Sequence, residues 1–464
     1  MSAAPGDYGA AVRLLEERGR FGVRLGLGRI RALLAALGDP QREFRGALIA
    51  GTNGKGSVLA LAGSALAAAG IRTGETPKPH LVSYRERLAI GGMPIDPATF
   101  TRLVAEILPI ADRVARRHGE PTEFELLTAI IYRWFAESGV STALVEVGLG
   151  GRLDATHAWD GGVAVITNVA LDHMDRLGAT IPLIAREKAA IIERGDVAVT
   201  GADGEALGVV RRRAARLGVL LMEVAPAPLV GLDRDGITAD LPRLGPTRVA
   251  LRGRHQAANV AVADALLDAL ETAGIAGVDA AARRRGYASA RWPGRLELVE
   301  VDGRDVLLDG AHNPAGAAAL ATALDDLRPM LTGGGAPDRP PITLVVASMA
   351  DKDVDGVIAA LLGSAGLRDA TVICTSVAMP RALAATDLAG RWRAAAPGLH
   401  IEAIADPGAA LDRALERDPR RRHGRAVARP AGPVVVAGSL YLVGEVRRRL
   451  VDDPLLRDPE DRAQ

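Results

Sequence analysis

The chain has 464 residues, which is too many for one ordinary hydrophobic core, so two domains are expected. Hydrophobic residues make up 48% of the chain and aromatic residues only 3%, so Ala, Val, Leu and Ile must build the cores. A formal net charge of +1 gives no strong field for holding nucleic acid or an anionic membrane surface, and we expect neither as a partner.

The N-terminal stretch "MSAAPGDYGAAVRLLEERGR" carries charges where a signal peptide would need an apolar run. No stretch approaches the roughly 20 apolar residues of a membrane-spanning helix. The single cysteine, Cys374, excludes an intramolecular disulfide and suits a reducing compartment. These features predict a soluble, cytoplasmic protein, and we expect it to be a monomer.

Short β-branched runs alternate with longer helical patterns along the chain. A first set of strands is expected at residues 45–52, 141–151, 163–171 and 197–201. Helices are expected near 57–70, 123–138 and 180–194. A second set of strands is expected at 305–311, 342–349, 371–377 and 433–440. Apolar strands that alternate with helices are typical of parallel βαβ units covered on both faces.

The stretch "GYASARWPGR" (286–295) separates the two sets of strands and is rich in small residues and Arg. We therefore predict an N-terminal domain of residues 1–291 and a smaller C-terminal domain of residues 292–464. Surface loops are predicted at 331–341 and 416–430. The second of these loops is rich in Arg and could attract anions, but a solvated loop is the favoured interpretation.

Only four of the 57 basic residues are lysines, namely Lys55, Lys78, Lys188 and Lys352. A bias in the coding DNA explains the excess of Arg, but it does not explain which lysines remain. Lysine carries a compact charge on an amine that can lose its proton when it is buried, which arginine cannot do. We therefore expect at least three of these lysines to take part in function.

The sequence "AGTNGKGS" (50–57) lies between an expected strand and an expected helix, as a phosphate-binding loop requires. It departs from the Walker A spacing at two places, Ile49 and Gly56. Its backbone N–H groups can still converge on phosphate oxygens, with Lys55 near the β- and γ-phosphates and Ser57 near Mg²⁺. The alternative is a turn whose glycines serve only close packing.

The loop resembles that of the Mur ligase superfamily, and further motifs resemble its folylpolyglutamate synthase/dihydrofolate synthase branch. In chain order these are "TPKPHL" (76–81), "TEFE" (122–125), "EVGLGGRLDAT" (146–156), "LDH" (171–173), "REKAAII" (186–192), "GRHQAAN" (253–259), "WPGRLE" (292–297), "DGAHNP" (309–314), "DKD" (351–353) and "GSLY" (438–441). The segment "LGLGRI" near residue 25 is similar to the family's N-terminal substrate segment. Single motifs of this kind carry little information, but ten in order are specific.

The resemblance implies an α/β fold, with an N-terminal P-loop ATPase domain that has a mostly parallel sheet and a smaller Rossmann-like C-terminal domain. It also implies an ATP-dependent amide ligase that adds L-glutamate to a folate or dihydropteroate carboxylate through an acyl phosphate, using ATP and two Mg²⁺ ions. Two alternatives stay open. One is a Mur-type ligase that joins an amino acid to a different acid, and the other is a catalytically silent nucleotide-binding regulator.

The resemblance also implies roles for individual residues. The implied ATP-binding residues are Thr52, Asn53, Gly54, Lys55, Gly56, Ser57, Asn259, Arg295 and Asp309. The implied metal ligands are Ser57, Glu146, His173 and Lys188, the last as a carbamate formed with CO₂. The implied substrate-binding residues are Gly26, Leu27, Lys78, Thr122, Phe124, Asp154, His312 and Ser439. Lys55, Lys188, His173 and His312 are the implied catalytic residues.

Several of these residues have simpler interpretations. Glu146 and His173 could be ordinary capping or packing residues, and Phe124 could belong to the core. Lys188 could be a lysine on a helix surface, paired with Glu187 or Glu193.

The chain departs from the family pattern at Lys78. The family usually has a serine there that binds the first Mg²⁺, and a protonated lysine cannot bind a cation. Because Pro77 and Pro79 restrict the loop, we expect Lys78 to be held extended. We predict that its amine contacts the γ-phosphate, or the acyl phosphate made from it.

Overall fold

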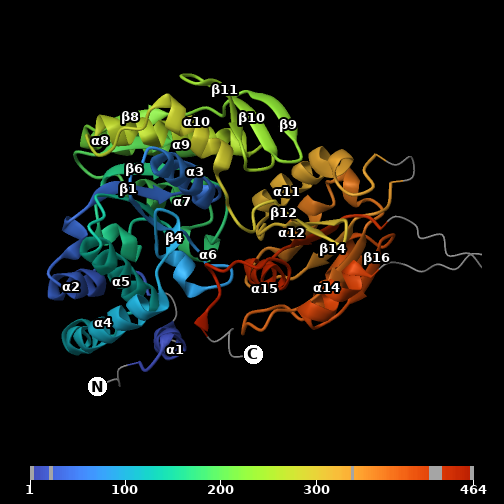
Figure 1. The fold of residues 1–464 in the computed structure, drawn as a ribbon, viewed down its shortest axis with the longest axis horizontal. Coiled ribbons are helices and arrows are strands. Elements are labelled where there is room, and N and C mark those ends of the chain that lie inside the picture. The colour runs from blue at the N-terminus through green and yellow to red at the C-terminus, as the bar shows by residue number, and fades with distance from the viewer. Residues whose placement is uncertain (1–4, 20–23, 336–338, 417–430, 460–464) are drawn as a thin grey trace, which may run out of the picture.

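The computed structural model describes residues 5–19, 24–335, 339–416 and 431–459. These residues form two α/β domains that lie side by side (Figure 1), as the predicted fold class required. The predicted loop at 416–430 lies outside the described residues except for Glu416, and so does the middle of the loop at 331–341. Within the described part of the chain, no helix is long and apolar enough to cross a membrane.

The first domain is built on an eight-stranded sheet of order β4-β3-β2-β5-β1-β6-β7-β8. Its strands are β1 (Arg45–Ala50), β2 (Thr73–Thr76), β3 (Ala89–Ile90), β4 (Met93–Pro94), β5 (Thr142–Glu146), β6 (Gly162–Ile166), β7 (Val197–Thr200) and β8 (Leu220–Glu223). Neighbouring strands are parallel except in the pairs β2–β3 and β3–β4. The phosphate-loop candidate follows β1 at the centre of this sheet.

Helices cover both faces of this sheet. One face carries α3 (Lys55–Ala68), α9 (Gln256–Thr272) and α10 (Ala280–Ser289), and the other carries α1 (Tyr8–Gly19), α2 (Gly28–Ala36), α4 (Pro97–His118) and α5 (Glu123–Glu137). Along β1, Ala47 and Ile49 face the first group while Leu48 and Ala50 face the second, as the two-residue repeat of a strand requires. Shorter elements near β7 are α6 (Met174–Leu177), α7 (Ile181–Ala189) and α8 (Gly204–Leu217).

A small antiparallel sheet, which was not predicted, lies above the gap between the domains in Figure 1. Its strands are β9 (Leu229–Asp233), β10 (Gly236–Leu241) and β11 (Gly245–Val249). In the turn between β9 and β10, the Arg234 guanidinium donates to both carboxylate oxygens of Asp305, at 2.8 and 2.5 Å. The small sheet therefore ties the first domain to the second.

The second domain contains a six-stranded sheet of order β12-β13-β17-β14-β15-β16, parallel except for the pair β12–β13. Its strands are β12 (Glu297–Val301), β13 (Arg304–Leu308), β14 (Thr343–Val346), β15 (Thr371–Cys374), β16 (His400–Ala403) and β17 (Val434–Ala437). One face packs against α11 (Pro314–Leu327), α12 (Val354–Leu361) and α13 (Ala385–Ala395), and the other against α14 (Pro407–Leu415) and α15 (Leu440–Leu450).

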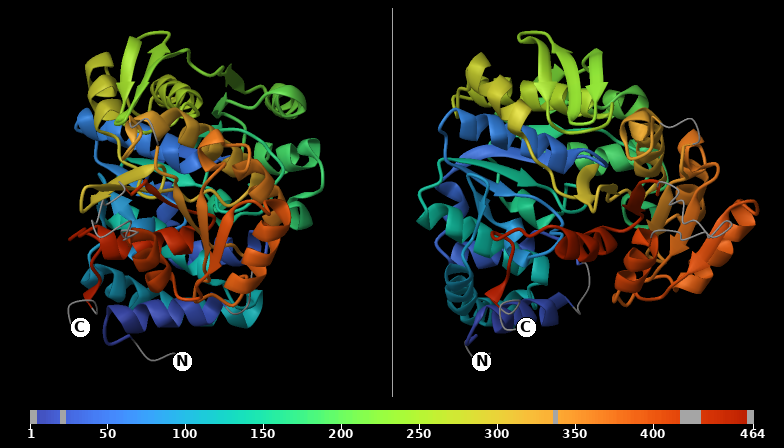
Figure 2. Two further views of the ribbon diagram at one scale, coloured as in Figure 1. Left: turned by 90° about the vertical axis from the view of Figure 1, so that its right-hand side faces the viewer. Right: turned by 45° about the vertical axis from the view of Figure 1, so that its right-hand side comes forward.

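The chain crosses between the domains twice. The first crossing runs from the end of α10 at Ser289 to the start of β12 at Glu297, and the predicted boundary at 291/292 falls within it. After α15 the chain returns to the first domain (Figure 2), where Arg85 binds the Asp458 carboxylate and the Leu455 carbonyl. The second domain is thus held at both of its ends.

Candidate active site

A cavity of about 780 Å³ lies where the carboxyl ends of the central strands of both sheets meet. Ligand sites of α/β proteins form at such strand ends. The cavity wall includes all four lysines of the chain, Lys55, Lys78, Lys188 and Lys352. Arg supplies nearly all the other positive charges of the chain, and all four lysines lie at this one site.

The loop between β1 and α3 forms the floor of the cavity and depends on its glycines. Gly54 has a φ of +81°, and a Cβ there would lie 2.3 Å from the Asn259 Oδ1. A Cβ at Gly56 would lie 2.3 Å from the Trp292 ring. Close packing therefore explains part of the glycine pattern. The Lys55 amine curls back to donate to the Gly51 and Thr52 carbonyls, both at 3.2 Å.

Glu146 ends β5 beside this loop and is buried. One carboxylate oxygen accepts the Lys78 backbone N–H at 3.0 Å, and the other lies 3.9 Å from the Lys55 amine. Burial raises the pKa of Glu146 against the opposing effect of Lys55. A divalent cation in the cavity would stabilise the charged form of this carboxylate.

Lys78 is held on the cavity wall, in the loop after β2. Its amine donates to the Glu146 carbonyl at 2.6 Å and lies 4.6 Å from the centre of the Phe124 ring. Burial lowers the pKa of Lys78 to about 8. The Lys78 amine therefore lies between the Glu146 carbonyl and the Phe124 ring.

Lys188 lies near the end of α7 and is buried, with its amine donating to the Gly51 carbonyl at 2.7 Å. Its neighbour Glu187 pairs with Arg152 instead, so Lys188 is not an exposed member of a surface ion pair. Burial and the nearby Lys55 lower the pKa of Lys188 to about 7. A large fraction of its amine is thus unprotonated near neutral pH.

Asp172 and His173 face the second domain across the cavity. The Asp172 carboxylate accepts from the Asn313 amide at 3.2 Å and from the Lys352 amine at 3.3 Å. These partners outweigh burial and lower the pKa of Asp172. His173 has a left-handed φ of +49°, and its Nε2 lies 3.5 Å from the Lys352 amine. Burial and Lys352 lower the pKa of His173.

Three polar residues, Asn259, Arg295 and Asp309, line the same cavity as the loop after β1. The Asn259 amide donates to Gln256 at 2.8 Å, which fixes its orientation at the start of α9. The Asp309 carboxylate accepts the backbone N–H groups of Leu296 and Ala311, both at 2.9 Å. Burial lowers the pKa of Arg295 and raises that of Asp309. All three side chains line the cavity.

His312 and Ser439 enter the cavity from the second domain. The His312 Nδ1 lies 2.8 Å from the Gly310 carbonyl, so this nitrogen must carry the proton. Burial lowers the pKa of His312 to about 4, which keeps the ring neutral and makes Nε2 an acceptor. Ser439 is 2% exposed, and its hydroxyl has no hydrogen-bond partner among the described residues.

Four residues assigned by resemblance do not line the cavity, namely Gly26, Leu27, Thr122 and Asp154. Thr122 caps α5 by accepting the Glu125 backbone N–H at 3.3 Å. Asp154 accepts the Leu149 N–H at 2.8 Å and also caps the short helix Ala155–Ala158. The Gly26 N–H donates to the Leu153 carbonyl, and Leu27 precedes α2. Thr122 thus supports the helix that carries Phe124, and Asp154 supports the turn that follows β5.

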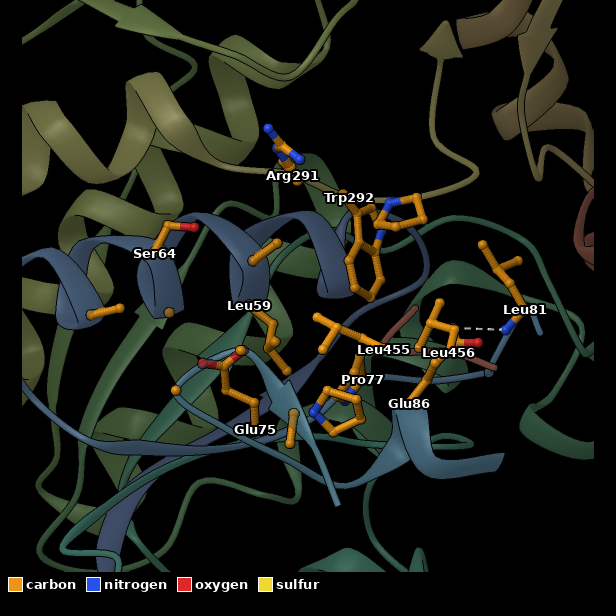
Figure 3. A pocket seen from close by; sticks show the side chains of 18 of the residues that line it. Leu59, Ser64, Glu75, Pro77, Leu81, Glu86, Arg291, Trp292, Leu455 and Leu456 are labelled. Carbon is orange, nitrogen blue, oxygen red and sulfur yellow. Dashed lines mark hydrogen bonds between the residues drawn. The ribbon is translucent and has the colours of Figure 1, made fainter. Parts of the chain in front are cut away.

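A second cavity, of about 380 Å³, lies behind the first, between α3, the interdomain connection and the C-terminal segment. Figure 3 shows the Trp292 ring pointing into it above Pro77 and Leu455, with Glu75 at its far end. Burial raises the pKa of Glu75 to about 7. Since Trp292 also packs on Gly56, this apolar space adjoins the phosphate-loop candidate.

The metal-binding capacity of the main cavity is modest. Among the residues that the structure describes, no group of three or more His, Cys, Asp or Glu side chains could hold a metal ion. Ser57 and Glu146 offer hard oxygen atoms of the kind Mg²⁺ prefers, and both line the cavity. These residues fit an ion that arrives with a triphosphate and takes most of its ligands from phosphate and water.

Sequence reasoning gave no role to Asn313 or Asp172 and left Lys352 without one. All three lie within or beside quoted motifs, "DGAHNP", "LDH" and "DKD". Asn313 also donates to the Asn53 side chain at 3.2 Å, so it joins the second domain to the loop after β1. The contacts of Asn313 and Lys352 with the first domain could not be predicted from the motifs, because they depend on how the two domains pack together.

A glycine-rich loop between strand and helix, facing a lysine-rich cavity closed by a second α/β domain, is an arrangement suited to an ATP-dependent ligase, which must neutralise phosphoryl charge and enclose its substrates. Residues 296–450 match the family model "Dihydrofolate synthetase, C-terminal domain". Folylpolyglutamate synthase of Lacticaseibacillus casei is 33% identical over 446 residues, covering 91% of this chain and 94% of that protein. The chain belongs to the folylpolyglutamate synthase/dihydrofolate synthase family.

Two further similarities support membership of this family. The structure of Mycobacterium tuberculosis folylpolyglutamate synthase complexed with ADP and AMPPCP has a TM-score of 0.83 and 33% identity, covering 96% of this chain and 100% of that one. The probable bifunctional folylpolyglutamate synthase/dihydropteroate synthase of Haloferax volcanii is 34% identical over 461 residues, 95% of this chain. The chain spans about half, 50%, of the length of that relative.

Proposed function

We propose that this chain is an ATP-dependent ligase that joins L-glutamate to the carboxylate of a folate or of dihydropteroate. The observation that carries the proposal is the interdomain cavity, which gathers the loop after β1 and all four lysines opposite His312 and Ser439. The family model and the Lacticaseibacillus casei relative support glutamate ligation to a folate-type acid. The ADP complex of the Mycobacterium tuberculosis relative supports ATP.

In the proposed reaction the γ-phosphoryl group of ATP passes to the acid's carboxylate, releasing ADP. The glutamate amine then attacks the acyl phosphate, and phosphate leaves as the amide forms. Lys55 neutralises phosphoryl charge during both steps. Gly54 and Gly56 bind the phosphates through their backbone N–H groups. Thr52 and Asn53 complete the same loop, and their own N–H groups donate to Asn168 at 3.0 Å. Asn259, Arg295 and Asp309 hold the rest of the nucleotide.

Mg²⁺ belongs to this proposal, as two ions held by Ser57, Glu146, His173 and a carboxylated Lys188. When bound, the ions neutralise charge on the transferred phosphoryl group. Lys188 fits carboxylation because its buried amine is partly unprotonated near neutral pH and can attack CO₂. We also propose a monomer in the cytoplasm, where the buried Cys374 stays reduced.

The test is ADP release from the purified chain with ATP, Mg²⁺, L-glutamate and either dihydropteroate or tetrahydrofolate. We expect release that requires both glutamate and one of the two acids, and a Lys55→Ala variant that folds but does not turn over. ADP release with glutamate and a non-folate acid only would indicate a different Mur-type ligase. Tight ATP binding without release in any mixture would indicate a silent regulator.

A further inference from the structure

The second cavity, of about 380 Å³, has no role in the proposed reaction. Its size lies within the range of roughly 300–1,000 Å³ that is usual for small-molecule sites. It is bounded by α3, the loop after β2, the interdomain connection and the C-terminal segment after α15. Most of this wall is apolar, as Figure 3 shows for Leu59, Pro77, Leu455 and Leu456. A molecule that fits this cavity must therefore have a mainly apolar body.

Five charged residues line the second cavity, and four of them have other partners or face the solvent. The Glu86 carboxylate accepts three backbone N–H groups of its own loop, at 2.7, 2.7 and 3.0 Å. Asp453 pairs with Arg447 at 3.4 Å. Arg295 also lines the main cavity, where two buried carboxylates attract its charge, and Arg291 is exposed. None of these four charges is left for a molecule inside the second cavity.

Glu75 is the fifth charged residue, and its charge is available. Its side chain reaches from β2 to α3, where a Cβ on Gly63 would lie 3.0 Å from the Glu75 Cδ. The Gly92 backbone N–H stabilises its charged form, and among the described residues no cation does. A carboxylate shielded from water without a cation lowers the stability of the fold. Residues that weaken a fold in this way are typical of binding sites, so a ligand explains Glu75 better than packing does.

Trp292 connects the second cavity to the loop after β1. Its ring lines both cavities and packs on Gly56, where a Cβ would lie 2.3 Å from the ring. Gly56 lies in the first turn of α3, directly after Lys55. A molecule in the second cavity would fill the space behind the Trp292 ring and keep the ring against Gly56. The occupancy of the second cavity would therefore influence the loop that faces the main cavity.

We propose that the second cavity is a regulatory site for a small amine with a flat apolar body, whose ammonium group pairs with Glu75 and whose body packs against Trp292 and Pro77. The ammonium group supplies the positive charge that the fold does not, through a charge-assisted hydrogen bond. Burial of the apolar body and its contact with the Trp292 ring supply the rest of the affinity. Binding of the amine does not depend on the proposed function, whereas its effect on ATP does.

The first test uses phenethylammonium as the probe and 2-phenylethanol, which has the same body without the charge, as its control. At pH 8, where Glu75 is mostly ionised, we expect the full chain to bind the amine with a Kd on the order of 1 mM and the alcohol roughly tenfold more weakly or less. Glu75→Gln should lose this preference, and Glu205→Gln, which changes an exposed carboxylate, should keep it. Calorimetry or NMR titration measures both ligands. No saturable amine binding below about 20 mM, or an unchanged preference in Glu75→Gln, would overturn the inference.

The second test measures whether the amine changes the affinity for ATP. Saturating phenethylammonium should tighten ATP binding by roughly two- to tenfold, and ATP should tighten amine binding by the same factor, because coupling between two sites is reciprocal. Trp292→Leu should bring this factor close to one. Displacement of the amine by ATP would place the probe in the main cavity, and affinities that do not respond to each other would exclude regulation, so either result would overturn the inference. Coupled binding in a chain that releases no ADP with glutamate and either acid would instead overturn the proposed function alone.

Discussion

At the scale of single residues, the proposed carboxylation of Lys188 would explain why the chain keeps a lysine at this position. Its buried amine donates to the Gly51 carbonyl and has a pKa lowered to about 7. We expect Lys188→Ala and Lys188→Arg to lose on the order of 100-fold or more in kcat, because neither side chain can form a carbamate.

Two measurements, rescue of activity by an added acid and the intact mass of the protein, distinguish loss of a carbamate from a packing defect. A short carboxylic acid added to Lys188→Ala should restore part of the activity, since it can occupy the place of the carbamate. The intact mass of the wild type in bicarbonate should show one added CO₂ that Lys188→Arg lacks. Full activity in Lys188→Arg would assign the lysine a structural role.

Lys78 stands where the family usually has a metal-binding serine, and in the structure its amine donates to the Glu146 carbonyl. If its amine leaves the Glu146 carbonyl to meet phosphate, Lys78→Ser should lower kcat several-fold and raise the Mg²⁺ concentration needed for half-maximal rate. Lys78→Ala should do so more severely. A Ser variant with unchanged Mg²⁺ dependence but a raised KM for the acid would place Lys78 with Phe124 on the aromatic side of the cavity.

At the scale of elements, the continuous apolar strands were predictable, whereas short strands and strands with an interrupted pattern were not, including the mostly buried β2 and β10. β1 and β5 are continuous apolar runs because helices cover both of their faces. In β9 the burial is slight and Asp, Gly and Arg interrupt the pattern around the turn, so no strand was expected. β3 and β4 have two residues each, too few for a pattern to show.

The same limit applies to the site. Motifs indicated which segments would supply side chains, and the cavity contains most of them. The contacts of Asp172 with Asn313 and Lys352 depend on how two separately folded domains meet, which no local pattern encodes. The packing of Trp292 on Gly56 across the interdomain connection was hidden for the same reason.

Glu75, on β2, gives a prediction about stability at this scale. Burial beside α3 raises its pKa from 4.5 to about 7. Below pH 4.5 both states hold the proton and there is no penalty. Between pH 4.5 and about 7 the unfolded state releases its proton first, so the free energy of unfolding falls as the pH rises. Above about pH 7 both states have released the proton, so the free energy of unfolding stays at this lower value.

We therefore expect Glu75→Gln to unfold at a higher temperature than the wild type at pH 8, with the difference shrinking toward pH 5. Calorimetry across this pH range would measure it. Glu205, which is exposed in the first turn of α8, is a control: its Gln variant should not unfold at a higher temperature than the wild type at pH 8, because a negative charge is favourable at the start of a helix. A Glu75→Gln variant that gains nothing at pH 8 would show that the carboxylate is solvated through the second cavity.

At the scale of the whole molecule, the active site depends on how the second domain is held against the first. Asn313 and Lys352 reach the first domain within the cavity, and Arg85 binds the returning C-terminal segment outside it. The small sheet adds a third connection, from Arg234 to the buried Asp305. Since both domains line the cavity, loosening any of these connections would separate groups that the proposed reaction must bring together.

Arg234 offers the cleanest test, because the chain contains a matched control on the same sheet. Arg234 and Arg248 have equal side-chain exposure, 36%, but Arg234 pairs across the domains with Asp305, which is 5% exposed, whereas Arg248 pairs with Asp233, which is 57% exposed. Hydrogen bonds from Arg234 and Thr332 outweigh burial and lower the pKa of Asp305. Arg234→Ala therefore leaves a buried charge poorly compensated, at a cost of about 1–3 kcal/mol, and Arg248→Ala should cost less than about 1 kcal/mol.

We expect Arg234→Ala to increase the radius of gyration measured by small-angle X-ray scattering and to lower kcat/KM, with both domains still folded by circular dichroism. Arg248→Ala should leave both quantities near the wild-type values, because its ion pair lies within one sheet. ATP together with the acid should bring the Arg234→Ala scattering back toward the wild type, since bound substrates connect the two domains. If the two variants behave alike, the small sheet does not hold the domains together, and the other contacts between them, inside the cavity and outside it, must do so.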